Sequence, residues 1–114
     1  MPMSTDTISK SAIKMTVIFR LEAGCLGPEG KSHIIAFCNF AQKRANKIAP
    51  AYIDLKITPR ISKDMPEIQY TLNNKGLSTP RVEKYLSLFK DDTDTFEETL
   101  NENLILLIEE YFER

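Results

Sequence analysis

The chain has 114 residues, 42% of them hydrophobic and 27% charged, and its 15 Lys/Arg and 16 Asp/Glu give a net charge of −1. This length accommodates one hydrophobic core but not two, and the composition excludes a disordered or collagen-like chain. No run of consecutive apolar residues exceeds five, which excludes a membrane-spanning helix of about 20 residues.

The two ends of the chain differ from its middle. Residues 1–9 carry neither the basic region nor the apolar segment of a secretory signal. The sequence therefore predicts a cytoplasmic protein with a flexible tail at residues 1–10 and a single domain at residues 11–114. Residues 1–90 have a net charge of +7, whereas residues 91–114 have a net charge of −8. This split indicates either an acidic segment that covers a basic surface or a solvated acidic helix.

The domain is predicted to begin with a strand and a helix. Residues 12–22 alternate between apolar and polar side chains, which is typical of a strand with one buried face. Gly27 as cap and Pro28 at the first helical position predict a helix over residues 28–47. Its core face, read from the helical spacing, consists of Ile34, Phe37, Cys38, Ala41, Ala45 and Ile48.

Further strands are predicted after this helix. Residues 51–58 alternate again and form the second strand, and residues 67–72 form the third. The residues at 73–76, Asn-Asn-Lys-Gly, predict a turn, because Asn and Gly tolerate positive φ. A very short strand at residues 76–78 follows. The predicted sheet is mixed and has three or four strands.

Two helices complete the predicted domain. Thr79 and Pro80 start the first, and an acidic turn at residues 91–94 ends it. Thr95 and Glu98 fit a capping box, so the last helix is predicted to start at Thr95 and to continue to the C-terminus. The resulting order, βαββ(β)αα, belongs to the α+β class.

The loop of residues 24–32, between the first strand and the first helix, is the only candidate site for a small ligand. It nearly matches the phosphate-binding pattern G-x-x-x-x-G-K-[ST], but Cys25 occupies the place of the first glycine and Pro28 removes an amide. A looser anion site remains open, because the N-termini of helices attract anions. Its predicted residues are Gly27, Gly30, Lys31 and Ser32.

Cys25 is also the only candidate nucleophile. A position just before a helix stabilises a thiolate, although free cysteines are more commonly buried as small apolar residues. Cys25 and Cys38 are not spaced as a metal-binding or redox pair. The sequence therefore predicts no further catalytic residue, no metal site and no cofactor.

The layout of residues 13–90 resembles the thioredoxin/glutaredoxin family. The shared features are a strand, a loop with Gly24-Cys25 and Pro28, a helix, a strand, a Met65-Pro66 pair before the next strand, a turn and a closing helix. In that family a cis-proline begins the third strand opposite the active cysteine, so the resemblance implies that Pro66 is a cis-proline facing Cys25. Pro28 stands where the second cysteine of C-x-x-C would be, and a short loop replaces the helix before the cis-proline. The resemblance therefore implies a monothiol role or a redox-inactive binding scaffold. A ferredoxin-like sandwich accounts for the same elements.

The sequence favours a non-enzymatic interaction module that forms a homodimer or binds another protein. The apolar arc of the last helix is wider than one core contact requires. Its predicted dimer residues are Leu104, Ile105, Leu106, Ile108 and Phe112. One alternative is monothiol redox chemistry or the binding of a small anion at residues 24–32. The other is nucleic-acid binding by the basic body, gated by the acidic last helix, which the sequence pI of about 5.8 disfavours. No membrane partner is predicted.

Overall fold

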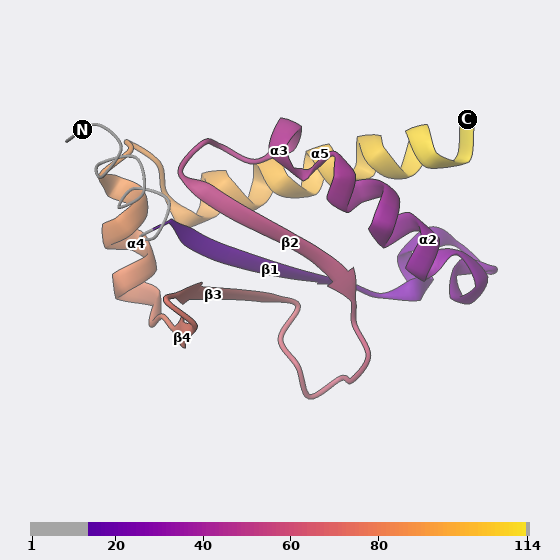
Figure 1. The fold of residues 1–114 in the computed structure, drawn as a ribbon, viewed down its shortest axis with the longest axis horizontal. Coiled ribbons are helices and arrows are strands. Elements are labelled where there is room, and N and C mark those ends of the chain that lie inside the picture. Colours follow the sequence, from indigo (N-terminus) through magenta and orange to yellow (C-terminus); the bar gives the residue numbers. More distant parts are fainter. Residues whose placement is uncertain (1–13, 114) are drawn as a thin grey trace, which may run out of the picture.

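The computed structural model describes residues 14–113, which form a mixed four-stranded sheet with helices packed against it (Figure 1). In chain order the elements are β1 (Met15–Leu21), the 3-10 helix η1 (Ala23–Leu26), α2 (Gly30–Lys43), α3 (Ala45–Ile48), β2 (Ile53–Pro59), β3 (Ile68–Leu72), β4 (Lys75–Gly76), α4 (Thr79–Ser87) and α5 (Thr93–Glu113). The α+β class and the mixed sheet of three or four strands predicted from the sequence are confirmed, whereas the single helix predicted over residues 28–47 is divided into α2 and α3. The predicted tail at residues 1–10 lies outside the described residues.

The sheet has the strand order β2-β1-β3-β4, with β1 parallel to β2 and antiparallel to β3. Val17 of β1 lies between Leu55 of β2 and Tyr70 of β3, so side chains from three strands share one face. The fully or nearly buried side chains of this face are Met15, Val17, Phe19, Leu21, Ile53, Leu55 and Ile57. The alternation of the first two strands therefore does mark one buried face, as expected.

Helices α2 and α5 pack on this buried face and meet each other there. Phe37 and Phe40 of α2 approach Tyr111 of α5 edge-on, with ring centroids 5.5 and 5.4 Å apart. Figure 1 shows α5 running along the length of the molecule and α4 at one end of the sheet. None of the helices within residues 14–113 is long and apolar enough to cross a membrane.

Helix α5 begins two residues earlier than predicted. The carboxylate of Asp92 accepts the backbone N–H of Thr95 at 2.8 Å and the Thr95 hydroxyl at 3.0 Å. Asp92 is therefore the N-cap, and the capping box predicted for Thr95 and Glu98 is wrong. Both residue types cap helices, and here the carboxylate with its two acceptor oxygens takes the cap position and binds the threonine.

Gln42 of α2 shields the outer edge of β2. Its Oε1 accepts the backbone N–H of Ile57 at 2.7 Å, and its Nε2 donates to the carbonyl of Leu55 at 3.0 Å. One side-chain amide thus takes the place that a neighbouring strand would occupy. Because an unpaired edge strand is a template for association with other chains, this contact protects the edge of β2 as well as stabilising the fold.

Gln42→Ala is expected to lower the free energy of unfolding by about 1–3 kcal/mol, because two backbone groups of buried residues lose their partner. Urea unfolding followed by circular dichroism measures this. Lys43→Ala, at the exposed neighbouring position of the same helix, is the control and should change the stability by less than about 0.5 kcal/mol. Equal urea midpoints for the two variants would mean that water replaces the Gln42 amide without any loss of stability.

Candidate functional site

The loop that the sequence singled out is closed on itself. Helix α2 begins at Gly30 rather than at Pro28, and η1 occupies the preceding turn. The N–H groups of Gly27 and Gly30 donate to carbonyls within the loop at 3.2 and 3.0 Å, and that of Ser32 donates to Glu29 at 3.1 Å. The Ser32 hydroxyl also donates to the Glu29 carbonyl, at 2.8 Å. With these donors in use, the loop offers an anion little more than the exposed side chain of Lys31.

The connection before β3 is anchored by Arg20 and contains no cis-proline. No cis peptide bond occurs within residues 14–113, so the cis-proline predicted at Pro66 is wrong. Arg20, only 7% exposed, donates through Nη1 to the Pro66 carbonyl at 2.9 Å and through Nη2 to Gln69 at 2.8 Å. Its backbone N–H donates to the carbonyl of Glu67 at 2.7 Å. These bonds tie the connection to β1 with an ordinary trans backbone.

The two thiols have opposite environments. Cys25 is exposed on η1, and Cys38 is buried on the core side of α2. Burial raises the pKa of Cys38 to about 11, because it disfavours the thiolate. Cys38 therefore stays protonated at neutral pH and serves as a small apolar side chain.

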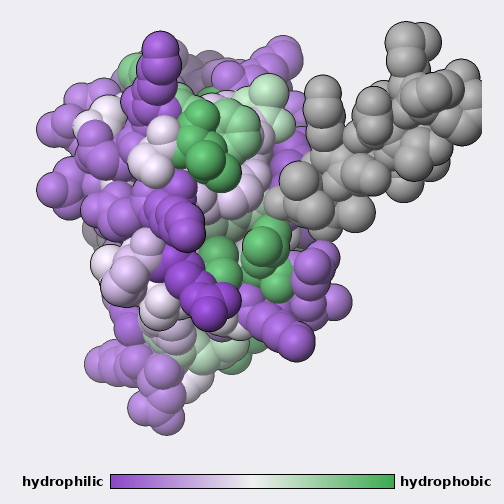
Figure 2. Space-filling model, turned by 90° about the vertical axis from the view of Figure 1, so that its left-hand side faces the viewer, coloured by the Kyte–Doolittle hydropathy of each residue, from purple (hydrophilic) through white to green (hydrophobic). Residues whose placement is uncertain are grey.

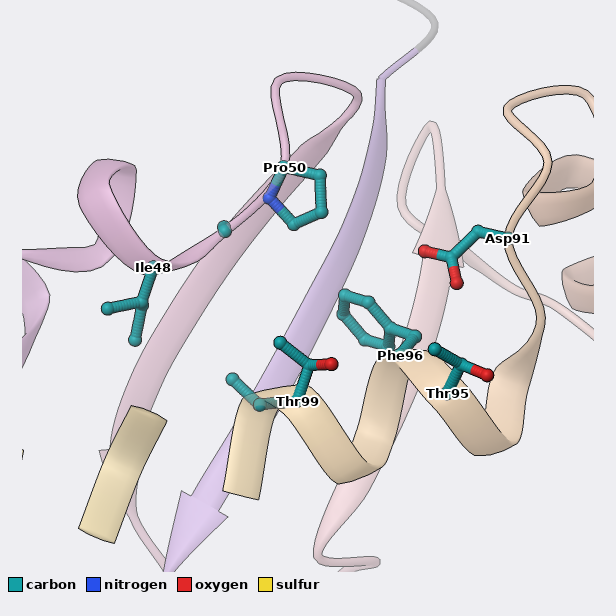
Figure 3. Close-up of a pocket in the computed structure, with 8 residues that line it drawn as sticks. Ile48, Pro50, Asp91, Thr95, Phe96 and Thr99 are labelled. Carbon is teal, nitrogen blue, oxygen red and sulfur yellow. The ribbon is translucent and has the colours of Figure 1, made fainter. Parts of the chain in front are cut away.

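A hollow of about 340 Å³ lies between the α3–β2 connection and the start of α5. Figure 3 shows Ile48 and Pro50 on one side of it, with Thr95, Phe96 and Thr99 of α5 on the other. Asp91 is the only charged residue among those that line it. A hollow of this kind could hold a small ligand only through the Asp91 carboxylate and the threonine hydroxyls.

The Asp91 carboxylate, however, is already engaged. One oxygen accepts the hydroxyl of Tyr52 at 2.6 Å, and the other accepts the backbone N–H of Asp92 at 2.8 Å. Burial, this hydrogen bond and the charge of Asp91 raise the pKa of Tyr52 to about 12, so the phenol stays protonated and keeps donating. The Tyr52 ring also stacks on Phe89, with centroids 4.1 Å apart. The Tyr52–Asp91 hydrogen bond joins the residue before β2 to the turn before α5, and both oxygens of the carboxylate are in use.

A second hollow, of about 290 Å³, continues along the same side of α5 and shares Ile48 with the first. Arg44 and Glu110 form an ion pair across it at 3.1 Å, and the guanidinium of Arg44 lies 3.8 Å from the centre of the Phe40 ring. Leu106 lies on this side of the helix. Arg44 and Glu110 therefore neutralise each other, and Lys47 is the remaining charged residue among those that line this hollow.

The predicted dimer residues divide into two groups. Leu104 is buried in the core and Ile108 is partly buried against it, so Leu104 is not an interface residue, contrary to the prediction. Ile105, Leu106 and Phe112 are 56%, 61% and 48% exposed. At about 100° per residue, Ile105 and Phe112 fall on one side of α5, while Leu106 points toward Arg44.

Acidic side chains border this pair of apolar residues. Helix α5 contains seven Asp/Glu and no Lys/Arg. Glu98 and Glu102 lie about one turn apart on the outward side, Glu109 follows about two turns later, and all three are exposed. We call Ile105, Phe112 and these three glutamates the α5 face.

The end of the molecule at α4 has a different surface. Figure 2 shows apolar side chains there in separate areas bordered by polar ones. Leu88 and Phe89, which directly follow α4, are exposed large apolar residues, but one face of Phe89 is covered by Tyr52. The exposed apolar residues at this end are therefore not spaced along one side of a helix, as Ile105 and Phe112 are on the α5 face.

No arrangement typical of a metal centre is present within residues 14–113, where no group of three or more His, Cys, Asp or Glu could hold an ion. The Nδ1 atom of His33 lies 3.2 Å from the Tyr111 hydroxyl, and its ring packs edge-on against Phe112. Comparison of the chain with family models, curated proteins and solved structures found no match. The functional argument therefore rests on the geometry.

Proposed function

We propose that the protein is a non-enzymatic binding module that recognises another protein through the α5 face. The observation that carries this proposal is the pair Ile105 and Phe112, two large apolar side chains exposed seven residues apart on one side of α5. The opposite side of the helix is anchored in the core by Phe96, Leu100, Leu104, Leu107 and Tyr111. A helix fixed in this way holds its outward side chains in place, which lowers the entropy cost of binding.

The energy available from this pair is sufficient for recognition. Burying one large apolar side chain contributes about 1.5–3 kcal/mol, and a few such anchors dominate the affinity of a typical interface. Ile105 and Phe112 are separated by seven residues, or about 10 Å along the helix axis. They therefore support an interface with two anchors and a charged border.

The charge of α5 argues for a partner other than a second copy. A symmetric dimer through this face would place the same acidic residues of two copies against each other. Like charges across an interface reduce affinity, and α5 contains no Lys or Arg to compensate for them. We therefore propose a different protein as the partner and treat the homodimer as the rival outcome.

The layout of β1 to α4 supports a thioredoxin-like scaffold, which we propose as the carrier of the α5 face rather than as a redox protein. Dithiol exchange needs an accessible attacking thiol and a second cysteine close enough to form a disulfide with it, whereas Cys25 lies on η1 and Cys38 lies eight residues into α2. Cys25 is exposed but Cys38 is buried. Without dithiol exchange, the role that we propose for the scaffold is to hold α5 in position.

Selection from a displayed library of random peptides tests the proposal. Peptides enriched on the wild-type protein are expected to bind the double variant Ile105→Asn/Phe112→Asn at least about tenfold more weakly, since two anchors are lost. Ile35→Asn is the matched control, because Ile35 is 67% exposed on α2 and lies outside the α5 face.

Enriched peptides that bind the double variant and the wild type equally would refute the proposal. Sedimentation of the protein at tens of micromolar measures its oligomeric state and so tests the rival, a homodimer through the α5 face. A dimer that dissociates in the double variant would mean that the α5 face binds a second copy, whereas a monomer supports a different partner.

A further inference from the structure

We infer that the segment recognised by the α5 face is a basic amphipathic helix. This inference rests on the proposed function and adds the chemistry of the partner. It is carried by three features of α5: unpaired acidic charge, the spacing of its apolar residues, and the lack of free backbone groups.

The acidic charge of the α5 face is not neutralised within the described chain. Glu110 forms an ion pair with Arg44, and Glu97 accepts a hydrogen bond from the hydroxyl of Tyr70. No ion pair involves Glu98, Glu102 or Glu109 within residues 14–113. Three exposed carboxylates on the outward side of α5 therefore remain available to Lys or Arg of a partner, and they repel phosphate groups of nucleic acids and anionic lipids.

The spacing on the α5 face matches a second helix. Ile105 and Phe112 lie two turns apart, Glu98 lies in line with them two turns before Ile105, and Glu102 and Glu109 lie beside this line. The face extends from residue 98 to residue 112, or about 21 Å at 1.5 Å per residue. A partner helix of about 14 residues spans this length, with apolar side chains between Ile105 and Phe112 and basic side chains beside the glutamates.

An extended peptide fits this surface less well than a helix. The interior of an α-helix uses its backbone N–H and C=O groups in its own hydrogen bonds, so α5 offers only side chains to a partner. An extended segment buried there would leave its own backbone groups without partners, and that is costly. A helical segment satisfies its backbone internally before it binds.

The test uses the full chain and a synthetic 18-residue probe built from Leu and Lys in a helical amphipathic pattern. Binding is followed by the fluorescence anisotropy of the labelled peptide. We expect the probe to bind the wild-type protein, to bind more weakly as salt rises, and to lose at least tenfold in affinity for Glu98→Gln/Glu102→Gln/Glu109→Gln. A peptide with Glu in place of Lys should not bind.

Two controls make the result specific. Glu29→Gln/Asp64→Asn/Glu67→Gln removes the same charge from exposed positions elsewhere and should leave the affinity unchanged. A peptide of the same composition in an order without an apolar side should bind at least tenfold more weakly than the probe. Equal affinity of the two triple variants, or of the two peptides, would overturn the inference.

The selected peptides separate this inference from the proposed function. If they depend on Ile105 and Phe112 but lack basic residues, the partner chemistry is wrong and the binding module stands. If the Leu/Lys probe depends on the three glutamates, the inference is supported. If the probe binds the Ile105→Asn/Phe112→Asn variant as well as it binds the wild type, the apolar anchors and with them the proposed function fail.

Discussion

Gly30→Ala is expected to destabilise the protein by about 3 kcal/mol or more, because the added methyl group has no room. A Cβ atom at this position would lie 1.7 Å from the carbonyl oxygen of Ala23 and 2.7 Å from its carbonyl carbon. Both atoms belong to the backbone of η1, so neither can move aside by a change of rotamer. The substitution must push η1 away from the first turn of α2.

Gly24→Ala is the matched control for this prediction. Gly24 also belongs to η1, but no atom lies within 4 Å of a Cβ built there. Its effect on urea unfolding should stay within about 0.5 kcal/mol. A Gly30→Ala protein with the stability of the control would mean that η1 is not held against α2, and the closed geometry of this loop would be wrong.

Gly30 also illustrates why the loop differs in geometry from the phosphate-binding loops whose pattern it nearly matches. The pattern of glycine, lysine and serine is shared by phosphate-binding loops and by tight turns that pack a short helix against a long one. A motif records residue types, whereas the direction of each N–H depends on the turns around it. Here the amide of Gly30 donates back to Gly27, at 3.0 Å, and the absent side chain makes room for Ala23.

Periodicity located the core where contacts are local to a helix or a strand. Phe37, Cys38 and Ala41 were predicted on the core face of the first helix, and all are buried. Phe40 was missed because it falls to one side of that face and is buried through Tyr111, which lies 71 residues further along the chain. Such a contact depends on how α2 and α5 cross, which the spacing within either helix does not determine.

The alternation of residues 12–22 puts Arg20 among the polar, outward side chains of the first strand, yet Arg20 is buried. The connection between β2 and β3 folds back over it and accepts two of its hydrogen bonds, from the side chain to Pro66 and from the backbone to Glu67. A buried arginine must have hydrogen-bond partners, and here backbone carbonyls and Gln69 supply them. The path of an irregular connection has no sequence period, so it could not be predicted.

The α5 face was partly predictable for the same reason that the core was. The wide apolar arc of the last helix indicated residues left over after core packing, and Ile105 and Phe112 are indeed exposed. Which of the five predicted residues would be used by the core depended on the rotation of α5 about its axis. The structure assigns Leu104 to the core, because that side of the helix faces the sheet.

Phe37→Ala is expected to lower the free energy of unfolding by about 3–5 kcal/mol, the range for removing a buried aromatic ring. Phe37 is fully buried, and its ring meets Tyr111 at 5.5 Å and Phe40 at 6.2 Å. The resulting cavity lies between α2 and the C-terminal half of α5. Ile35→Ala, two residues away on the exposed side of α2, should cost less than about 0.5 kcal/mol in the same urea titration.

The same variant links the core to the α5 face. With the Phe37 ring gone, the last turns of α5 lose a main contact with α2, so amide hydrogens around residues 104–111 should exchange faster than those of β1. Ile105 and Phe112 would then be less fixed in position, and Phe37→Ala should weaken peptide binding although neither residue has changed. Unchanged peptide affinity in a folded but destabilised Phe37→Ala protein would mean that the face does not need a rigid α5. Because Ile35→Ala leaves the contact between α2 and α5 intact, it should alter neither the exchange rates nor the affinity.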